Sequence, residues 1–461
     1  MKELSTKDIS WSKRTIFFLF FICLFLLFWD HRWTKGDIIV WDIWSYYAYL
    51  PVVFLEQDLK MTFLDDQQWK ILIYYAPSHL ENGNWLIKTT MGMSIIYLPY
   101  FLIGHLWALI HSGMNEGGFS QPYQIMIALS GPVNLLIGLL ALRKVMLSYF
   151  TETVTALSMI FIVLGTNALH YTYNEGAMSH IHNFMLFSLF MRLTQLWHDN
   201  PTWKRTVLIS LLSGFIALVR PNNGIIGLFF IFYNVYDLKS LKQKLQLFWK
   251  LRLKLLILPF IAISVWIPQF CYWKYITGHW MFNSYIGERF FFDRPRFYYA
   301  MFSYTKGWMV YTPMAAFGLI GLFLMGKAAK QIRFAVPIFM LLNIYIVFSW
   351  WCWWYGGGYS QRALIDSYPI LALAMAAFLT FIFKSKIAKY TVMPIMFLLL
   401  ALSLFQTWQY NVKIIHWEAT TKELYWTVFL KTKHPKNYQE LLHSVNYEAA
   451  MKGEVKYFGE K

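Results

Sequence analysis

The chain has 461 residues, of which 57% are hydrophobic and only 14% are charged, and its formal net charge is +17. Soluble proteins carry about a quarter charged residues, so this composition excludes an ordinary soluble protein and indicates an integral membrane protein with many spans. The basic residues lie in short clusters between hydrophobic runs rather than on a soluble domain, which argues against a nucleic-acid partner. Cys23, Cys271 and Cys352 lie in or beside hydrophobic runs and follow neither a disulfide nor a zinc pattern.

The first hydrophobic run extends from Thr15 to Trp29 and follows a short basic segment. No small-residue cleavage site succeeds it. We therefore predict an uncleaved first span, with the N-terminus inside and Asp30 onward outside.

Residues 30–122 are predicted to form one large external loop with two amphipathic interfacial helices, at about 42–56 and 66–76. The apolar run 91–110 inside this loop has the length of a span. If it crossed the membrane, the basic clusters that follow would all lie outside, against the positive-inside rule. If it only dips into the membrane, all of them lie inside; they are 143–144, 192–205, 239–254, 327–333 and 384–389. Pro99 interrupts the run, so we predict a re-entrant segment.

The remaining spans are predicted at 123–142, 153–169, 181–197, 205–219, 223–236, 255–275, 308–326, 334–352, 363–383 and 390–408. The fourth and fifth of these are short for a bilayer of about 30 Å, and we expect a hairpin of short helices there. With the first span, the fold is an all-α polytopic membrane protein of about eleven transmembrane helices. Residues 1–408 form the transmembrane domain, and 409–461 form a small external C-terminal tail.

The stretch 37–60, DIIVWDIWSYYAYLPVVFLEQDLK, places a carboxylate among aromatic side chains where the chain leaves the membrane. Asp42, Tyr46 and Tyr49 are spaced at i, i+4 and i+7, so they share one face if this stretch is helical. One interpretation is a helix N-cap with an aromatic interfacial belt behind it. The other is a functional carboxylate, which we favour because further unusual polar groups are predicted on the same side of the membrane.

Those further groups lie in the predicted external loops. The candidate substrate-binding residues are Tyr46, Tyr49, Glu175, His180, Arg220, Glu288, Arg289 and Arg362. The positive-inside rule disfavours external arginines, so the ones that remain require a reason. Arg362 follows the glycine-rich stretch YGGGYSQ, and a guanidinium in a flexible loop at headgroup depth suits a phosphate.

Each candidate also has a simpler structural interpretation. Arg220 can cap a short helix or reach lipid headgroups, and Glu288 and Arg289 can be solvated loop charges. His180 and His182 are two residues apart, so they point to different sides of a helix and favour packing over metal binding. We expect Asp366, four residues after Arg362, to form a structural salt bridge with it.

The chemistry that fits this set is sugar transfer from a polyprenyl-phosphate donor, whose tail needs lipid and whose phosphate lies at headgroup level. Transfer requires a base to accept the proton of the acceptor hydroxyl, and Asp42 is the candidate catalytic residue. The departing phosphate requires cationic stabilisation, which the arginines supply. A single base opposite the leaving group implies inversion at the anomeric carbon.

The chain resembles the GT-C membrane glycosyltransferases, the group of protein O-mannosyltransferases and lipid A aminoarabinose transferases, in the order in which these features occur along the sequence. The resemblance rests on Asp42 in WDIWSYYAYLP, the Pro99 segment, Arg220 in VRPNN and Arg362 in YGGGYSQR, and it covers about residues 1–408. In the second predicted external loop, residues 170–180, Glu175 is the nearest match to the family's acidic position, but that loop is otherwise histidine-rich. Asp42 has no acidic neighbour.

The resemblance implies a bacterial enzyme of the cytoplasmic (inner) membrane with a periplasmic active site that serves the cell envelope. Its partners would be a polyprenyl-phosphate sugar, a glycolipid, glycan or protein acceptor, and the lipid bilayer. The sequence indicates no cofactor and no metal ligand set, and it leaves open a divalent metal.

Two other functions fit parts of the pattern. A lipid-linked sugar flippase or transporter would carry ionisable residues near mid-membrane and a weak internal repeat, whereas here the charges lie at span ends and no repeat is visible. An O-antigen ligase or polymerase also uses external arginines, but its large external loop usually comes late in the chain rather than first.

Overall fold

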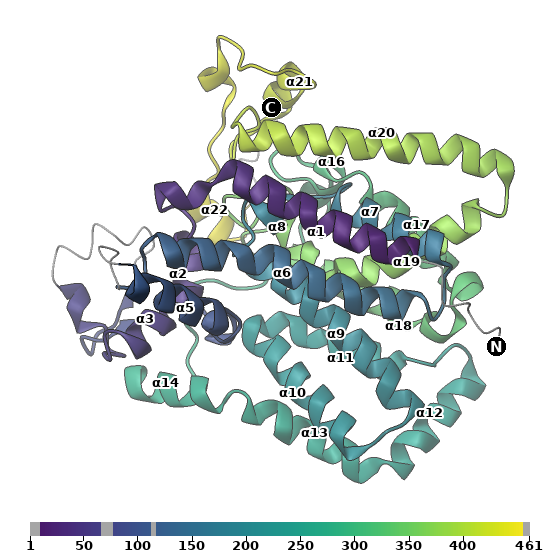
Figure 1. Ribbon diagram of the computed structural model, residues 1–461, viewed down its shortest axis with the longest axis horizontal. Helices are drawn as coiled ribbons and strands as arrows, with labels where there is room; N and C mark the ends of the chain where they lie inside the picture. The colour runs from purple at the N-terminus through teal and green to yellow at the C-terminus, as the bar shows by residue number, and fades with distance from the viewer. Residues whose placement is uncertain (1–9, 66–76, 112–116, 455–461) are drawn as a thin grey trace.

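The computed structural model describes residues 10–65, 77–111 and 117–454, and it is a mostly helical membrane protein (Figure 1). Six helices of these residues are long and apolar enough to cross a membrane, or seven if the bent pair α13 (Arg252–Ser264) and α14 (Ile267–Thr277) is one span. The six are α1 (Trp11–Asp30), α5 (Gly92–Ile110), α6 (Gln121–Met146), α18 (Ala335–Phe348), α19 (Tyr368–Ile382) and α20 (Lys386–Asn411). Three of them adjoin a 3₁₀ turn: η1 (Arg32–Lys35), η4 (Lys330–Ile332) and η5 (Arg362–Ser367).

Other predicted spans coincide with helices that do not meet these length and composition limits. They are α7 (Glu152–Val163), α9 (Ser179–Asp199), α10 (Trp203–Val219), η3 (Pro221–Ile226) with α11 (Gly227–Phe232), and α17 (Ala315–Ala328). The short hairpin predicted after residue 204 is therefore present as α10 followed by η3 and α11. The count of eleven spans stays a prediction.

The helix α19 is the centre of the bundle. Every residue from 363 to 379 is buried, and the helix contacts α7, α9, α17 and α18. The continuous apolar run permits this position, because a helix that is hydrophobic all round can pack against other helices on every side. Arg362 and Asp366 lie in η5, directly before this helix, so the most deeply buried element of the fold positions both residues.

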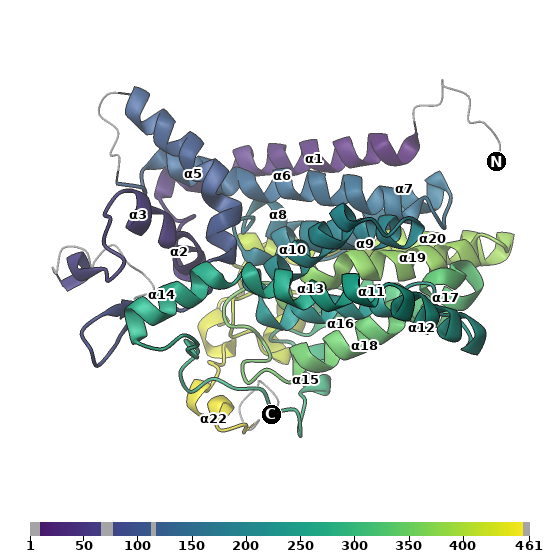
Figure 2. The ribbon, with the colours of Figure 1, turned by 90° about the horizontal axis from the view of Figure 1, so that it is seen from below.

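The helices leave two polar ends, which the views in Figures 1 and 2 separate along the long axis. The site end carries α2 (Trp41–Tyr47) and α3 (Tyr49–Phe54). The short helix α8 (His170–Tyr173) lies further along the bundle, against α1, α6 and α9. The basic end carries α12 (Leu238–Lys250) and the connection between α19 and α20. At the basic end, Arg143 pairs with Glu152 at 2.8 Å and the Lys330 ammonium lies 4.0 Å from the Tyr236 ring centroid. Which compartment each end faces stays a prediction.

The first loop is built differently from its prediction. The interfacial helix expected at 42–56 is broken at Ala48 into α2 and α3. The second interfacial helix, at 66–76, lies outside the described residues. The rest of the loop forms η2 (Thr62–Asp65) and a small antiparallel hairpin of β1 (Ser78–His79) and β2 (Trp85–Leu86).

The helix α5 lies at the site end, oblique to α1 and α6 (Figure 2). Its first residue, Gly92, packs against the backbone of Leu218 and Val219 at the end of α10. Twelve residues later, Gly104 packs against the backbone of Tyr123 at the start of α6. The helix is long and apolar enough to cross a membrane, so the prediction that it dips in without crossing stays a prediction.

The C-terminal segment after α20 folds over the loops of the site end. It contains α21 (Lys422–Val428), η6 (Tyr438–Leu441) and α22 (Tyr447–Met451), and the loops beneath it include α15 (Phe297–Phe302) and α16 (Trp308–Tyr311). Arg296 donates a hydrogen bond to the carbonyl of Gly453, and a small apolar cluster joins Ile414, Leu424, Val428 and Leu441.

We predict that His111 and Lys436 are accessible from the same side of the membrane and Lys386 from the other side. Single cysteines at these exposed positions, on a Cys271→Ser background, should report this, because Cys23 and Cys352 are buried. A membrane-impermeant maleimide should label His111→Cys and Lys436→Cys in intact cells, and Lys386→Cys only after permeabilisation. Labelling of His111→Cys only after permeabilisation would show that α5 crosses the membrane.

Candidate active site

The structure brings Asp42 and Arg362 into direct contact, although 320 residues separate them. Arg362 Nη2 donates to Asp42 Oδ2 at 2.9 Å. The side chain of Asp42 is 36% exposed and that of Arg362 is 15% exposed, so the pair lies at the surface of the site end with the carboxylate on the open side. The predicted base and the predicted phosphate ligand therefore belong to one ion pair.

Asp42 does not act as a helix N-cap. The N-cap of α2 is Val40, and Asp42 lies in the first turn, where a carboxylate is favourable near the positive end of the helix dipole. The structural alternative of an N-cap at Asp42 is thus wrong.

The salt bridge predicted between Arg362 and Asp366 is also wrong. Residues 362–367 form a 3₁₀ turn, in which positions three apart are aligned and positions four apart diverge, whereas the prediction assumed the α-helical spacing. Arg362 is directed to the first loop and Asp366 into the bundle.

Asp366 is a buried carboxylate with three polar partners. It is 2% exposed, and its Oδ1 lies 2.8 Å from His180 Nδ1. Asn223 Nδ2 donates to its Oδ2 at 2.7 Å, and Arg220 Nε lies 3.7 Å from the same oxygen. An isolated buried charge is very unfavourable, so these partners compensate for its desolvation. His180 is buried as well, which places this predicted substrate-binding residue beneath the site rather than on its surface.

Arg220 is held in place by this network and by the backbone. It is the C-cap residue of α10 in extended conformation, and Pro221 then starts η3. Its Nη1 lies 3.1 Å from His180 Nδ1. In the sequence VRPNN, Asn223 follows Arg220 by three residues, the length of one 3₁₀ turn, and both side chains contact Asp366. Asn223 was not predicted as a functional residue.

Tyr46 lies among the charges of the site, and Tyr49 does not. Burial raises the pKa of the Tyr46 phenol, the charge of Asp42 raises it further, and the guanidinium groups of Arg220 and Arg362 oppose this rise. Its hydroxyl lies 3.5 Å from Ser179 Oγ. The Tyr49 hydroxyl instead donates to the carbonyl of Thr89 at 2.7 Å.

Two further tyrosines, Tyr285 and Tyr355, were not predicted as site residues. Burial raises the pKa of each phenol, and the charge of Arg220 opposes that rise in both. Arg220 therefore lies within electrostatic reach of Tyr46, Tyr285 and Tyr355, which come from three different loops. Aromatic side chains near a cation form a surface on which a sugar ring can stack.

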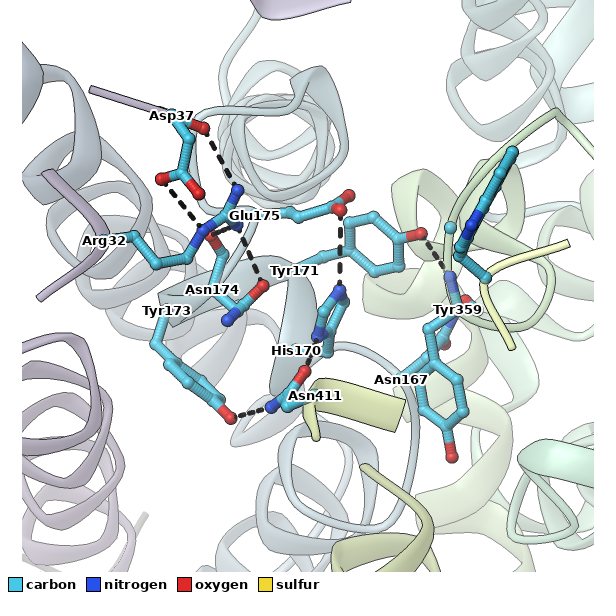
Figure 3. Close-up of polar contacts among 12 residues, drawn as sticks. Arg32, Asp37, Asn167, His170, Tyr171, Tyr173, Asn174, Glu175, Tyr359 and Asn411 are labelled. Carbon is cyan, nitrogen blue, oxygen red and sulfur yellow. Dashed lines mark hydrogen bonds and ion pairs between the residues drawn. The ribbon is translucent and has the colours of Figure 1, made fainter. Parts of the chain in front are cut away.

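Glu175 lies in a polar cluster behind this site (Figure 3). His170 is located between Glu175 and Asn411, with its Nε2 3.9 Å from Glu175 Oε1 and its Nδ1 2.8 Å from Asn411 Oδ1. Burial alone would raise the pKa of Glu175, but His170, Arg32 and Arg362 outweigh it and lower the pKa to about 2. The only acidic residue in the predicted second external loop is thus ionised at neutral pH.

Gly131 in α6 allows the turn that carries Glu175 to approach. A Cβ atom at this position would lie 2.5 Å from the carbonyl oxygen of Thr172 and 2.6 Å from the Cα of Gly176. Only glycine fits there, so this contact holds the turn between α8 and α9 against α6. His180 follows this turn as the second residue of α9.

Glu288 connects the first loop to the segment between α14 and α15. It forms an ion pair with Lys88 and accepts a hydrogen bond from Trp351 Nε1 at 3.0 Å. Arg289 is exposed, and its guanidinium lies 4.7 Å from the ring centroid of Phe291. Both residues were predicted to bind substrate; the structure gives Glu288 a bridging position, and Arg289 a stacking contact.

Lys306 links the glycine-rich loop to the C-terminal segment through hydrogen bonds. Its buried ammonium donates to the carbonyls of Gly358 and Trp417, and the Gly358 amide donates to Trp417 as well. Burial lowers the pKa of Lys306 from 10.5 to about 7. Tyr355 and Ser360, with φ of 57° and 55°, adopt a conformation that residues other than glycine rarely take.

The loop before Arg362 therefore has a strained backbone that hydrogen bonds from Lys306 hold in place. Glu418 of the C-terminal segment also contacts this loop, because it accepts a hydrogen bond from Trp354 Nε1 at 2.9 Å. Glu418 accepts a second hydrogen bond from Tyr447 within the C-terminal segment. The roles of Lys306 and of the C-terminal tail were not predicted, because hydrogen bonds to backbone carbonyls require no sequence motif.

No group of three or more histidine, cysteine, aspartate or glutamate side chains in the described part of the chain is placed to hold a metal ion. His182 Nδ1 lies 2.8 Å from Asn134 Nδ2, so His180 and His182 face different partners, as their spacing predicted. No model of a known protein family matches the chain, and a search of curated proteins finds no match.

We predict that Asp366→Asn destabilises the protein far more than a matched change in an exposed ion pair. Removing one partner of a buried pair costs about 3 kcal/mol or more, because Arg220 and His180 lose their counter-charge. The control is Asp293→Asn, since Asp293 is 74% exposed and pairs with Arg294 at 3.6 Å. The thermal unfolding midpoint in detergent should fall by several degrees for Asp366→Asn alone. Equal midpoints for the two variants would contradict a structural role for Asp366.

Proposed function

We propose that this chain is a GT-C-type membrane glycosyltransferase that transfers a sugar from a polyprenyl-phosphate donor to a glycolipid, glycan or protein acceptor. The observation that carries the proposal is the Asp42–Arg362 pair, a partly exposed carboxylate 2.9 Å from a guanidinium at one end of a membrane protein. Arg220, fixed on the buried Asp366, adds a second cation beside it. A base and two cations at one site match the needs of this transfer.

The donor phosphate would replace Asp42 as the partner of Arg362. A phosphate carries more charge than a carboxylate and accepts both N–H groups of the guanidinium fork, so it competes for this arginine. Asp42 would then be released next to the bound donor. In this scheme the base becomes free only when the donor is present.

The released Asp42 accepts the proton of the acceptor hydroxyl. The acceptor oxygen forms a bond to the anomeric carbon, and the bond from that carbon to the phosphate oxygen breaks. The polyprenyl phosphate leaves with the electron pair, and Arg220 and Arg362 stabilise its charge. Attack opposite the leaving group inverts the anomeric carbon.

An apolar groove next to Arg220 suits the polyprenyl chain. It is a cavity of about 530 Å³ at the bend between α13 and α14, and Pro221, the residue after Arg220, forms one wall. The other lining residues are Ile263, Trp266, Phe270, Trp273, Met281, Phe282 and Asn283. An isoprenoid chain in this groove would bring its phosphate to the arginine.

The site end would face the periplasm of a bacterium, with the N-terminus inside and the C-terminus outside. This orientation is supported by α12 and the connection between α19 and α20, which carry basic clusters and lie at the opposite end of the molecule from α2, which carries Asp42.

A lipid-linked sugar transporter is the second candidate. It is favoured by the buried Asp366–His180 pair, because ionisable side chains buried within a bundle are typical of transport pathways. The pair lies at the end of the central helix rather than at its middle, which fits a site at the membrane surface better.

We predict that Asp42→Asn lowers the turnover of sugar transfer by about a hundred-fold or more, because the amide keeps the shape but cannot accept the proton. Transfer from a polyprenyl-phosphate sugar would be measured in detergent. The control is Asp65→Asn, which neutralises an exposed carboxylate of the same loop whose contact is with Trp85. Activity of Asp42→Asn within a few-fold of the wild type would refute the base assignment and favour the transporter.

A further inference from the structure

The helix α12 at the basic end shows its apolar side to the outside. Leu238, Leu241, Leu245 and Trp249 recur at helical spacing, and Leu245 and Trp249 are 60% and 74% exposed. The side that faces the protein is partly polar, since its buried residues are Ser240 and Lys244. An ordinary surface helix has the opposite arrangement, and the described part of the chain leaves the apolar side of α12 uncovered.

The helix is nevertheless held firmly. The Lys244 ammonium donates to the carbonyls of Phe230 at 3.2 Å and Tyr233 at 2.9 Å, and it contacts His198. Asp237 caps the first turn with a reciprocal pair of hydrogen bonds to Ser240. The exposed leucines are thus presented by a fixed helix.

The corner between α12 and α13 forms a cavity of about 790 Å³ with two kinds of wall. Lys242, Lys250 and Arg252 supply cations. Trp249, Leu255, Leu256 and Pro259 supply an apolar wall. The apolar surface continues along α13, in which no residue is buried and Phe260 is 71% exposed.

The charge of this region has one sign. Residues 239–254 contain six lysines and arginines, and the sequence has no aspartate or glutamate from 238 to 287. Lys244 and Lys254 are engaged with backbone carbonyls, whereas Lys239, Lys242 and Lys250 are exposed. Cations next to a continuous apolar surface complement a ligand that has an anionic head and a hydrocarbon body.

We propose that the α12–α13 corner binds an anionic phospholipid, with its phosphate headgroup at Lys242, Lys250 and Arg252 and its acyl chains along the outer face of α13. The site is at the opposite end of the molecule from Asp42 and does not depend on sugar transfer. A lipid is favoured over an acidic protein because the apolar surface runs on into α13, one arm of a candidate membrane-spanning pair.

The test is lipid binding by the detergent-solubilised full chain, measured by native mass spectrometry. Phosphatidylglycerol should bind about ten-fold or more tighter than phosphatidylcholine, because each nearby Lys or Arg adds to the attraction of an anionic headgroup. The triple variant Lys242→Gln, Lys250→Gln, Arg252→Gln should lose this preference. The matched control, Lys384→Gln, Lys386→Gln, Lys389→Gln, removes three exposed cations elsewhere at the basic end and should keep it.

Two results of the binding measurements would overturn the proposal. One is an unchanged preference for phosphatidylglycerol in the triple variant; the other is displacement of the lipid by equimolar glycerol 3-phosphate, which would indicate a site for a soluble anion. A photoreactive phosphatidylglycerol provides a readout on the wild-type chain, independent of how the variants fold. Its cross-links should map to residues 238–260, and cross-links confined to other segments would also contradict the proposal.

Discussion

The burial of one carboxylate constrains the architecture of the site. Asp366 lies directly before the central helix and is 2% exposed, and His180, Asn223 and Arg220 surround its carboxylate and compensate for its desolvation. These partners come from α9, η3 and the end of α10. All three elements therefore meet at the carboxylate of Asp366. Arg220 is thereby held in a defined position beside Tyr46.

The same 3₁₀ turn that buries Asp366 directs Arg362 the other way, to the first loop. The two arginines of the site therefore differ in their partners. Arg220 pairs with a carboxylate that is 2% exposed and has two other partners, His180 and Asn223. Arg362 pairs with a carboxylate that is 36% exposed and therefore open to solvent. The proposed replacement of Asp42 by an anionic substrate requires such a solvent-accessible partner on one arginine and a fixed partner on the other.

The loop that carries Arg362 requires support from distant parts of the chain. Its positive φ angles at Tyr355 and Ser360 are unfavourable by themselves, at about 1–3 kcal/mol each. Lys306 and the Trp417 backbone bind Gly358 and offset this strain. The C-terminal tail is consequently part of the site, although it contributes no side chain to the Asp42–Arg362 pair.

Residue type and charge distribution allowed much of this to be predicted from the sequence. The composition indicated a helical membrane protein, and the positive-inside rule predicted that the basic clusters lie apart from Asp42, Arg220 and Arg362. In the structure, α12 and the connection between α19 and α20 lie at the opposite end from α2, which carries Asp42. The pairings were not predictable, because Asp42 and Arg362 are 320 residues apart and local spacing rules do not reach that far. Asp366 was assigned to the wrong arginine because an α-helical period was assumed for a 3₁₀ turn. Tyr49 was grouped with Asp42 for a similar reason, since the helix is broken at Ala48.

The exchange of Asp42 for a phosphate at Arg362 is the central claim, and a binding cycle tests it most directly. The affinity for a polyprenyl phosphate would be measured for the wild type, Asp42→Asn, Arg362→Ala and the double variant, with the uncharged polyprenol as reference ligand. Because Asp42 competes for Arg362, Asp42→Asn should bind the phosphate more tightly than the wild type. Arg362→Ala should bind it about ten-fold or more weakly, since a charge-assisted contact is lost, and adding Asp42→Asn to that variant should give no gain. Affinities unchanged by Arg362→Ala, or an equal gain from Asp42→Asn with and without Arg362, would contradict the account.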